Sequence, residues 1–173
     1  MCDLATLDAA TPEDAPVLSD LLELYQFELR TTFALTRGPD GRFGYARLPR
    51  YWSEPETHFP FLIRVGERVA GFALATRGSP ASDEPDVLDV AEFFVRTTER
   101  RAGVARRAAG LLWDRLPGRW IVRVAEANTV GLGFWDAVVR DYTRGVFTVG
   151  AVAGRTQLFR VFSFATRAVI RRA

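Results

Sequence analysis

The sequence predicts a single α/β domain, residues 1–173, in which helices cover both faces of one β-sheet. Short apolar segments of strand length alternate with longer segments whose apolar residues recur at helical spacing. Their order is strand, helix, strands, helix, strand, helix, strand, and a chain of this length forms one hydrophobic core. Two stretches rich in glycine and proline, 38–44 and 78–85, are short enough to be loops within that domain.

The N-terminal third predicts a strand, a helix and a segment without a clear pattern. Residues 4–7 are expected to form the first strand. A helix is expected to begin at Thr11, because this hydroxyl residue is followed by a proline and two acids, and leucines at helical spacing continue to about Arg30. The segment 31–58 predicts only a short helix over 48–53.

The rest of the chain predicts a hairpin, a central strand and four further elements. Segments at 59–65 and 69–76 flank a short turn that contains glycine, as in an antiparallel hairpin. Residues 87–95 are mostly apolar on both faces, which suits a strand covered by helices on each side. The remaining elements are a helix over 103–116, a strand over 120–125, a helix over 129–139 and a final strand over 157–164.

Composition excludes several classes of chemistry. The 23 basic residues are all arginine, which rules out Schiff-base and Walker-type lysines, and one histidine with one cysteine supports neither disulfides nor a Cys/His metal site. The net charge is only +2 and the arginines are interspersed with acids, so we expect no nucleic-acid partner. No apolar run reaches the length of a membrane span and the acidic N-terminus does not suit a secretory signal, so we expect a cytoplasmic protein without a membrane partner. His58 is expected in a solvent-facing loop.

A candidate anion site follows the central strand. Gly103 and Ala105 are small, which lets the backbone approach a ligand, and the N–H groups at the start of the next helix favour an anion. Several guanidinium groups near this point would recognise a pyrophosphate. They belong to Arg100, Arg101, Arg106 and Arg107.

This turn and its spacing resemble the GNAT superfamily of acetyl-CoA-dependent N-acetyltransferases. The family's phosphate turn reads Arg/Gln-x-x-Gly-x-Gly/Ala, five residues after an aliphatic residue that closes the fourth strand, here Val95. The resemblance covers about residues 60–140. It implies a mixed, mostly antiparallel sheet, acetyl-CoA as cosubstrate, and transfer of the acetyl group to a primary amine of a small molecule or peptide. The implied cofactor-binding residues are Phe94, Val95, Arg96, Arg100, Arg101, Ala102, Gly103, Val104, Ala105 and Arg106.

A second element of the same family follows the next strand. It is an asparagine, a small residue three positions later and an aromatic pair: Asn128, Gly131, Phe134 and Trp135. The resemblance implies that the amide of Asn128 hydrogen-bonds the pantetheine arm and that Phe134 and Trp135 contact the cofactor. Family members commonly have tyrosine where Trp135 stands, and that phenol often reprotonates the leaving thiolate, a role that an indole does not readily fill.

Acetylation of an amine needs a base that takes the ammonium proton. Glu92 is the first candidate, because burial in an apolar strand would raise the pKa of a carboxyl group toward neutrality. Asp89 is the rival, since it stands where several family members place a catalytic glutamate, and a bulge in the strand would change which acid faces the substrate. Tyr142 or water is the candidate acid for the thiolate.

The acceptor site is expected in the segment 31–58. Its aromatic residues and arginines would suit an acceptor with an aromatic or anionic portion. They are Phe43, Tyr45, Tyr51 and Trp52 together with Arg42, Arg47 and Arg50. Two questions stay open at this point. The chain is either an enzyme or a non-catalytic acyl-CoA-binding module, and it is either a monomer or a homodimer.

Overall fold

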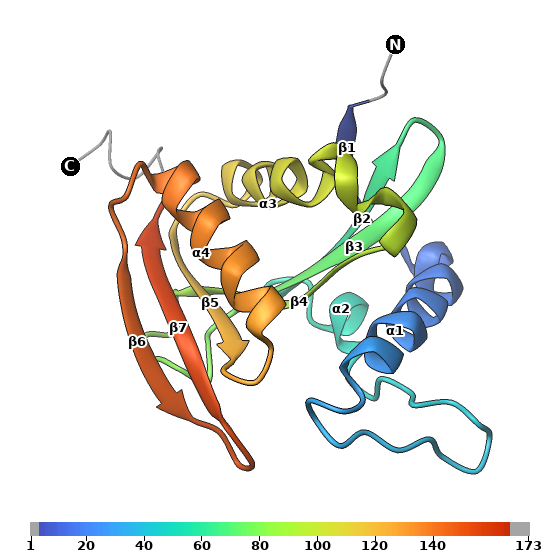
Figure 1. Cartoon of the computed structure of the whole chain (residues 1–173). Coiled ribbons are helices and arrows are strands. Elements are labelled where there is room, and N and C mark those ends of the chain that lie inside the picture. Colours follow the sequence, from blue (N-terminus) through green and yellow to red (C-terminus); the bar gives the residue numbers. More distant parts are fainter. Residues whose placement is uncertain (1–3, 167–173) are drawn as a thin grey trace.

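A computed structural model describes residues 4–166, with the side chains of Arg101 and Ala102 outside the described set. Seven strands are present: β1 (Ala5–Ala9), β2 (His58–Val65), β3 (Arg68–Arg77), β4 (Leu88–Val95), β5 (Arg119–Ala125), β6 (Thr148–Ala153) and β7 (Leu158–Ala165). The helices are α1 (Ala15–Leu29), α2 (Arg50–Ser53), α3 (Val104–Arg115) and α4 (Thr129–Thr143), with 3₁₀ turns η1 (Pro12–Asp14) and η2 (Thr97–Ala102). The strands form one sheet in the order β1-β2-β3-β4-β5-β7-β6 (Figure 1). Only β4 and β5 run parallel, which confirms the predicted mixed, mostly antiparallel sheet.

Helices cover both faces of this sheet, as the sequence predicts (Figure 1). α1 and α2 cover one face, where their leucines and Tyr51 pack on Leu62, Phe72 and Leu74 of the hairpin strands. α3 and α4 cover the other face over a core that includes Trp113 and Trp120. Among residues 4–166, none of the helices has the length and apolar character that crossing a membrane requires.

Three predictions made from the sequence differ from the structure. β6 is not predicted, because Thr148–Ala153 is an exposed edge strand of small and aliphatic residues without an alternating pattern. α4 continues to Thr143, four residues beyond the predicted end. The prediction of a solvent-facing loop for His58 is wrong: it is the first residue of β2, only 9% exposed, and its ring meets Tyr51 edge-on at 5.0 Å. This burial, together with the nearby Arg50, lowers the pKa of His58.

β4 is irregular at the centre of the sheet, and two of its features define the site. Leu74 of β3 pairs with Glu92 and the next residue pairs with Val90, so Ala91 is the extra residue of a β-bulge. Pairing with β5 extends only to the pair of Val90 and Val122, and beyond it the two strands diverge (Figure 1). An opening therefore separates the C-terminal halves of β4 and β5.

Candidate active site

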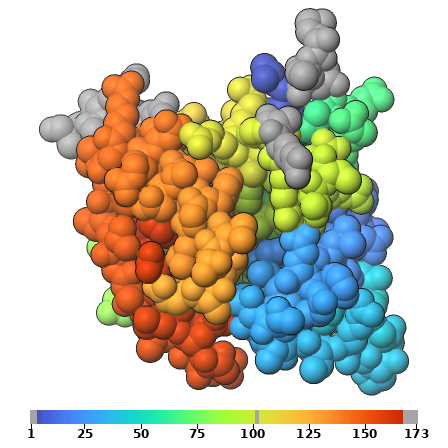
Figure 2. Space-filling model, in the orientation of Figure 1, coloured from blue at the N-terminus to red at the C-terminus, as the bar shows by residue number. Residues whose placement is uncertain are grey.

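Two hollows meet at the opening between β4 and β5. The first, which we call the large groove, has a volume of about 420 Å³ and lies between α1, the end of β4 and the start of α4. The second, which we call the small cavity, has a volume of about 240 Å³ and is bounded by α1, the loop after it, β4, β5 and β7. Figure 2 shows the surface of α1 in blue meeting that of α4 in orange on this face. The residues common to both hollows are Tyr25, Leu29, Phe93, Asn128 and Trp135.

The turn before α3 lies at one end of the large groove. Gly103 is the N-cap of α3 and has φ +73°, a backbone conformation that favours glycine. A Cβ at this position would meet no atom within 4 Å, so backbone conformation and not crowding within the protein explains the glycine. Arg100 joins the turn to two other elements: its Nε donates to the Val95 carbonyl at 2.7 Å and its Nη2 to Glu28 of α1 at 2.6 Å. The start of α3 is thereby held against the end of β4.

The end of β4 presents free backbone toward the opening. The N–H of Arg96 donates to the Ala70 carbonyl of β3 at 2.8 Å. Because successive residues of a strand point their N–H groups to opposite edges, the N–H of Val95 is directed toward the β5 side, where no strand pairs with it. This edge can accept an extended ligand as an additional strand-like partner.

The remaining predicted cofactor residues are divided between the groove and other contacts. Ala105 lines the groove, and the buried Phe94 and Val95 form its floor. Val104 is instead buried in the core between α3 and the sheet. Arg106 is turned toward α4, where it pairs with Asp141 at 3.1 Å, outside the groove. The side chains of Arg101 and Ala102 are not among those described.

The structure explains the motif of asparagine, small residue and aromatic pair at the start of α4. The Oδ1 atom of Asn128 accepts a hydrogen bond from the N–H of Gly131 at 3.0 Å and so caps α4. A Cβ on Gly131 would lie 2.5 Å from the amide nitrogen of Asn128, which explains the small residue three positions later. Phe134 and Trp135 line the groove and pack around Phe93, with ring centroids 6.3 and 5.1 Å away. The amide nitrogen of Asn128 is left to face the two hollows.

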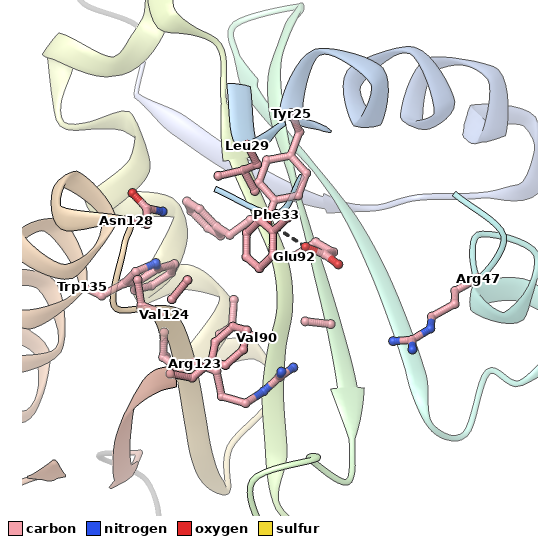
Figure 3. A pocket seen from close by; sticks show the side chains of 15 residues that line it. Tyr25, Leu29, Phe33, Arg47, Val90, Glu92, Arg123, Val124, Asn128 and Trp135 are labelled. Carbon is pink, nitrogen blue, oxygen red and sulfur yellow. Dashed lines mark hydrogen bonds between the residues drawn. The ribbon is translucent and has the colours of Figure 1, made fainter. Parts of the chain in front are cut away.

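Glu92 lies on the wall of the small cavity, beside the junction (Figure 3). Its Oε2 accepts a hydrogen bond from the Tyr25 hydroxyl at 2.7 Å, and its Oε1 accepts one from the Tyr45 hydroxyl at 3.1 Å. Burial raises the pKa of Glu92 above its usual value, and the two hydrogen bonds offset this only in part. Burial, followed by the neighbouring Glu92 charge, raises the pKa of both tyrosines, so their hydroxyls stay protonated.

Asp89 shares the face of β4 with Glu92 but has a different environment. The bulge at Ala91 adds one residue between the two acids, so side chains three positions apart in sequence point to the same face. Asp89 is fully buried and forms a two-pronged ion pair with Arg123 of β5, at 2.8 and 3.0 Å, and it also accepts a hydrogen bond from Ser79. It lines neither hollow. The arrangement favours Glu92 over Asp89 as the acid that meets a substrate.

Tyr142, the candidate acid, does not join this site. Its side chain lies between α3 and α4, packs against Trp113 at 4.8 Å and donates to Asp114 at 2.7 Å. It lines a separate depression there and neither of the two hollows at the junction. The reason is its position late in α4, about two turns beyond Trp135, where the helix has left the opening.

Three site residues are not predicted from the sequence: Tyr25, Arg123 and Phe159. In the sequence, Tyr25 is one member of the apolar face of α1, although its hydroxyl distinguishes it from the leucines of that face. Arg123 is a charge within an otherwise apolar strand, which is a signal that could have identified it. Of the residues expected in the segment 31–58, only Arg47 lines the small cavity. Tyr45 joins the site through its hydrogen bond to Glu92. Arg42 pairs with Asp20, Arg50 pairs with Glu54, and Tyr51 lies in the core beneath α2.

No metal site is evident in the described part of the chain. Within residues 4–166, no group of three or more His, Cys, Asp or Glu side chains is arranged to hold a metal ion. The polar groups at the junction are instead a carboxyl group, phenols, an amide and guanidinium groups. These groups bind and exchange protons with organic ligands.

Comparison with known proteins gives matches to solved structures alone. No family model and no curated protein sequence matches the chain. An acetyltransferase from Thermus thermophilus superposes with a TM-score of 0.63 at 19% identity, over 95% of this chain and 99% of that one. The aminoglycoside acetyltransferase AAC(6')-Ib, solved with ribostamycin and coenzyme A, gives a TM-score of 0.67 at 14% identity, over 99% and 98%. The ribosomal L7/L12 α-N-protein acetyltransferase RimL, solved with coenzyme A, gives a TM-score of 0.64 at 13% identity, over 95% of this chain and 96% of that one.

These structures share one architecture across nearly their whole length. All are GNAT acetyltransferases, and several contain coenzyme A or acetyl-CoA. The sheet order, the diverging fourth and fifth strands and the turn before α3 of the present chain are thus parts of a known fold. The chain has the fold of the GNAT acetyltransferases.

Proposed function

We propose that this protein is an acetyl-CoA-dependent N-acetyltransferase that transfers the acetyl group directly to a primary amine. The observation that carries the proposal is the junction: the large groove and the small cavity meet between β4 and β5, and a carboxyl group in the small cavity, Glu92, is hydrogen-bonded to Tyr25, which lines both hollows. A donor in one hollow and an acceptor in the other would bring their reacting atoms together at this point.

The large groove is the proposed site of acetyl-CoA. The N-terminus of α3, capped by Gly103, would bind the pyrophosphate through backbone N–H groups, and Arg100 lies beside it. The pantetheine arm would pair with the free edge of β4 at Val95 and meet the amide of Asn128. The N–H of Val95 would then polarise the thioester carbonyl. The GNAT enzymes of the same fold that contain coenzyme A or acetyl-CoA support this assignment.

Glu92 is the proposed base, with Asp89 as a structural partner of Arg123. An amine arrives as an ammonium ion, and the Glu92 carboxylate takes one proton from it and releases that proton to solvent. The neutral amine then attacks the thioester carbonyl and forms the C–N bond. The C–S bond breaks as the tetrahedral intermediate collapses, Glu92 takes the second amine proton, and the sulfur leaves as a thiolate. The raised pKa of Glu92 makes it a stronger base than an ordinary carboxylate.

Tyr25 is the phenol nearest to this chemistry and is the proposed acid. It lines both hollows and donates to Glu92 at 2.7 Å. Once Glu92 has taken the second amine proton, the carboxylate charge that, together with burial, raises the pKa of Tyr25 is neutralised. The Tyr25 hydroxyl proton would then pass to the leaving thiolate, and Glu92 would return the second amine proton to Tyr25. The phenol of Tyr25 on α1 would thereby act as the proton donor, since Trp135 on α4 has no acidic hydroxyl group.

The test is release of free thiol from acetyl-CoA in the presence of a broad panel of primary amines. We expect thiol release that requires the amine, with mass spectrometry showing one added acetyl group on the acceptor. Tight binding of acetyl-CoA without release by any amine would contradict the enzyme and support the alternative, a non-catalytic acyl-CoA-binding module. Failure to bind acetyl-CoA at all would contradict both.

A further inference from the structure

Two arginines reach the small cavity, and they differ in their partners. Arg123 points in from β5 but is neutralised by its two-pronged pair with Asp89. Arg47 points in from the loop before α2 (Figure 3). Among residues 4–166 its side chain makes no hydrogen bond or ion pair. The cavity therefore contains one guanidinium group whose five donors are available to a ligand.

The acidic residues of the cavity form no ion pair with Arg47. Glu92 is the one carboxyl group among the described side chains that line it, and both of its oxygens already accept hydrogen bonds from tyrosines. Arg47 acts on Glu92 only through its charge, which lowers the pKa of that carboxyl group against the larger rise that burial causes. Glu126, which follows the cavity-lining Ala125 in sequence, pairs with Arg160 at 3.0 Å. A ligand with several ammonium groups would find one carboxylate and would also face the positive charge of Arg47.

The positions of these groups define the orientation in which an acceptor would lie in the small cavity. In Figure 3, Asn128 and Arg47 lie at opposite sides of the cavity, with Glu92 between them. Asn128 borders the large groove, so the reacting amine would lie on the Glu92 side and the rest of the acceptor would extend toward Arg47. The volume of about 240 Å³ is below the range of about 300–1,000 Å³ typical of pockets for drug-sized ligands, so the acceptor is small.

The walls between these polar ends are aromatic. Phe33 and Phe159 stack at 6.2 Å on one side, and Phe93 and Trp135 meet edge-to-face at 5.1 Å on the other. All four line the cavity. Such walls suit an acceptor that carries an apolar body together with its charged groups.

We infer that the acceptor is a small amine that carries a carboxylate, with its amine at Glu92 and its carboxylate bound by Arg47. This inference rests on the proposed function and specifies its substrate class. A planar guanidinium group pairs with a carboxylate through two parallel hydrogen bonds, and one unpaired arginine matches one such anion. The site thus selects against polycationic amines such as aminoglycosides.

The test compares acceptors that differ only in the anionic group. Free-thiol release is measured with L-phenylalanine and L-phenylalaninamide, with 6-aminohexanoate and 6-aminohexanamide, and with kanamycin as a polycation. The rates are compared at equal concentrations of neutral amine, because the amide raises the free-amine fraction of phenylalanine. We expect kcat/KM at least tenfold higher for the carboxylates. Equal rates within each pair, or a preference for kanamycin, would overturn the inference.

Variants of Arg47 locate the effect. Arg47→Gln should raise KM for the carboxylates at least tenfold with little change in kcat, in the KM for acetyl-CoA, or in the rate with the amides. Arg47→Glu should reverse the preference. Arg50→Gln is the matched control, since Arg50 is exposed, pairs with Glu54 and lies outside the cavity. An equal loss for carboxylates and amides in Arg47→Gln would assign Arg47 a structural role.

Binding separates failure of this inference from failure of the proposed function. If no amine releases thiol, calorimetry of L-phenylalanine against the protein saturated with coenzyme A still measures recognition of the carboxylate. Binding of L-phenylalanine that L-phenylalaninamide does not share, and that Arg47→Gln abolishes, supports the anion site without catalysis. Equal binding of L-phenylalanine and L-phenylalaninamide would overturn the inference.

Discussion

The large groove and the small cavity share a wall at Tyr25, Phe93 and Trp135 but are built in different ways. The groove takes much of its lining from two short stretches of sequence, the end of β4 through the start of α3 and the start of α4, with α1 closing its other side. The cavity draws on six parts of the chain: α1, the loop after it, β4, β5, the start of α4, and β7. Local sequence therefore specifies most of the donor side, whereas the acceptor side exists only once the sheet and α1 have assembled.

The largest expected effect is at the proposed base in the small cavity. Glu92→Gln should lower kcat by about 10²–10⁴-fold, the usual contribution of a general base, and should leave the affinity for acetyl-CoA nearly unchanged. Steady-state kinetics with calorimetry of acetyl-CoA binding measures both. In the wild type, activity should fall as the pH drops through the pKa of Glu92, at a higher pH than for an ordinary glutamate because burial raises that pKa. The variant should lose this acid limb; full activity in Glu92→Gln would remove Glu92 as the base.

Asp89 provides the structural contrast to Glu92. Asp89→Asn would leave Arg123, whose side chain is 21% exposed, without its charged partner, and should lower the free energy of unfolding by about 3–5 kcal/mol. Denaturant unfolding measures this loss, while turnover per folded molecule should stay close to that of the wild type. Glu126→Gln, which breaks a more exposed pair with Arg160, should cost about 1 kcal/mol or less. A folded Asp89→Asn protein without activity would instead make Asp89 the base.

On the donor side, the turn before α3 is expected to be sensitive to backbone conformation alone. Gly103→Ala places a Cβ on a residue at φ +73°, which costs about 1–2 kcal/mol, and should weaken acetyl-CoA binding by up to about tenfold as the turn adjusts. Thermal unfolding and the dissociation constant report the two effects. Gly133→Ala is the control, because Gly133 is exposed within α4 and has open space around it, so alanine there should be neutral or stabilising. Equal behaviour of the two variants would contradict a special role for the turn.

The smallest shift in the pH dependence is expected from removing either of the two phenols that hold Glu92. Tyr25→Phe and Tyr45→Phe each remove one hydrogen bond that lowers the pKa of Glu92, so the acid limb should move to higher pH by up to about one pH unit in both. Only Tyr25→Phe should also lower kcat at the optimum, because only Tyr25 lines both hollows. The pH dependence of kcat measures both. An equal kcat in the two variants would argue against Tyr25 as the acid.

The same contrast explains how far the sequence predicts this molecule. Most elements and the donor-side motif follow from local patterns: the helix start at Thr11, the hairpin, and the small residue required beside Asn128. β6 escapes prediction, since an exposed edge strand has no buried face to impose alternation.

The members of the small cavity are harder to predict because their neighbours are distant in the sequence. Tyr25 and Glu92 are 67 positions apart, and Arg123 and Asp89 are 34 apart. Sequence could name Glu92 and Asp89 as rivals, but the choice between them depends on Arg123, which no local pattern places beside either acid. Tyr142 illustrates the converse: it lies close to Trp135 in sequence, but the length of α4 carries it away from the opening.

The extra residue at Ala91 has a consequence for how this strand tolerates change. Upstream of it, β4 is held by pairing on both edges; downstream, it is paired on one edge only. Deleting Ala91 would bring Asp89 and Glu92 two positions apart, the spacing at which a regular strand directs side chains to one face, so the side chains of β4 would keep their layers and only the bulge would be lost. A deletion elsewhere in β4 would instead turn one half of the strand to the opposite layer and break the fold and the site together.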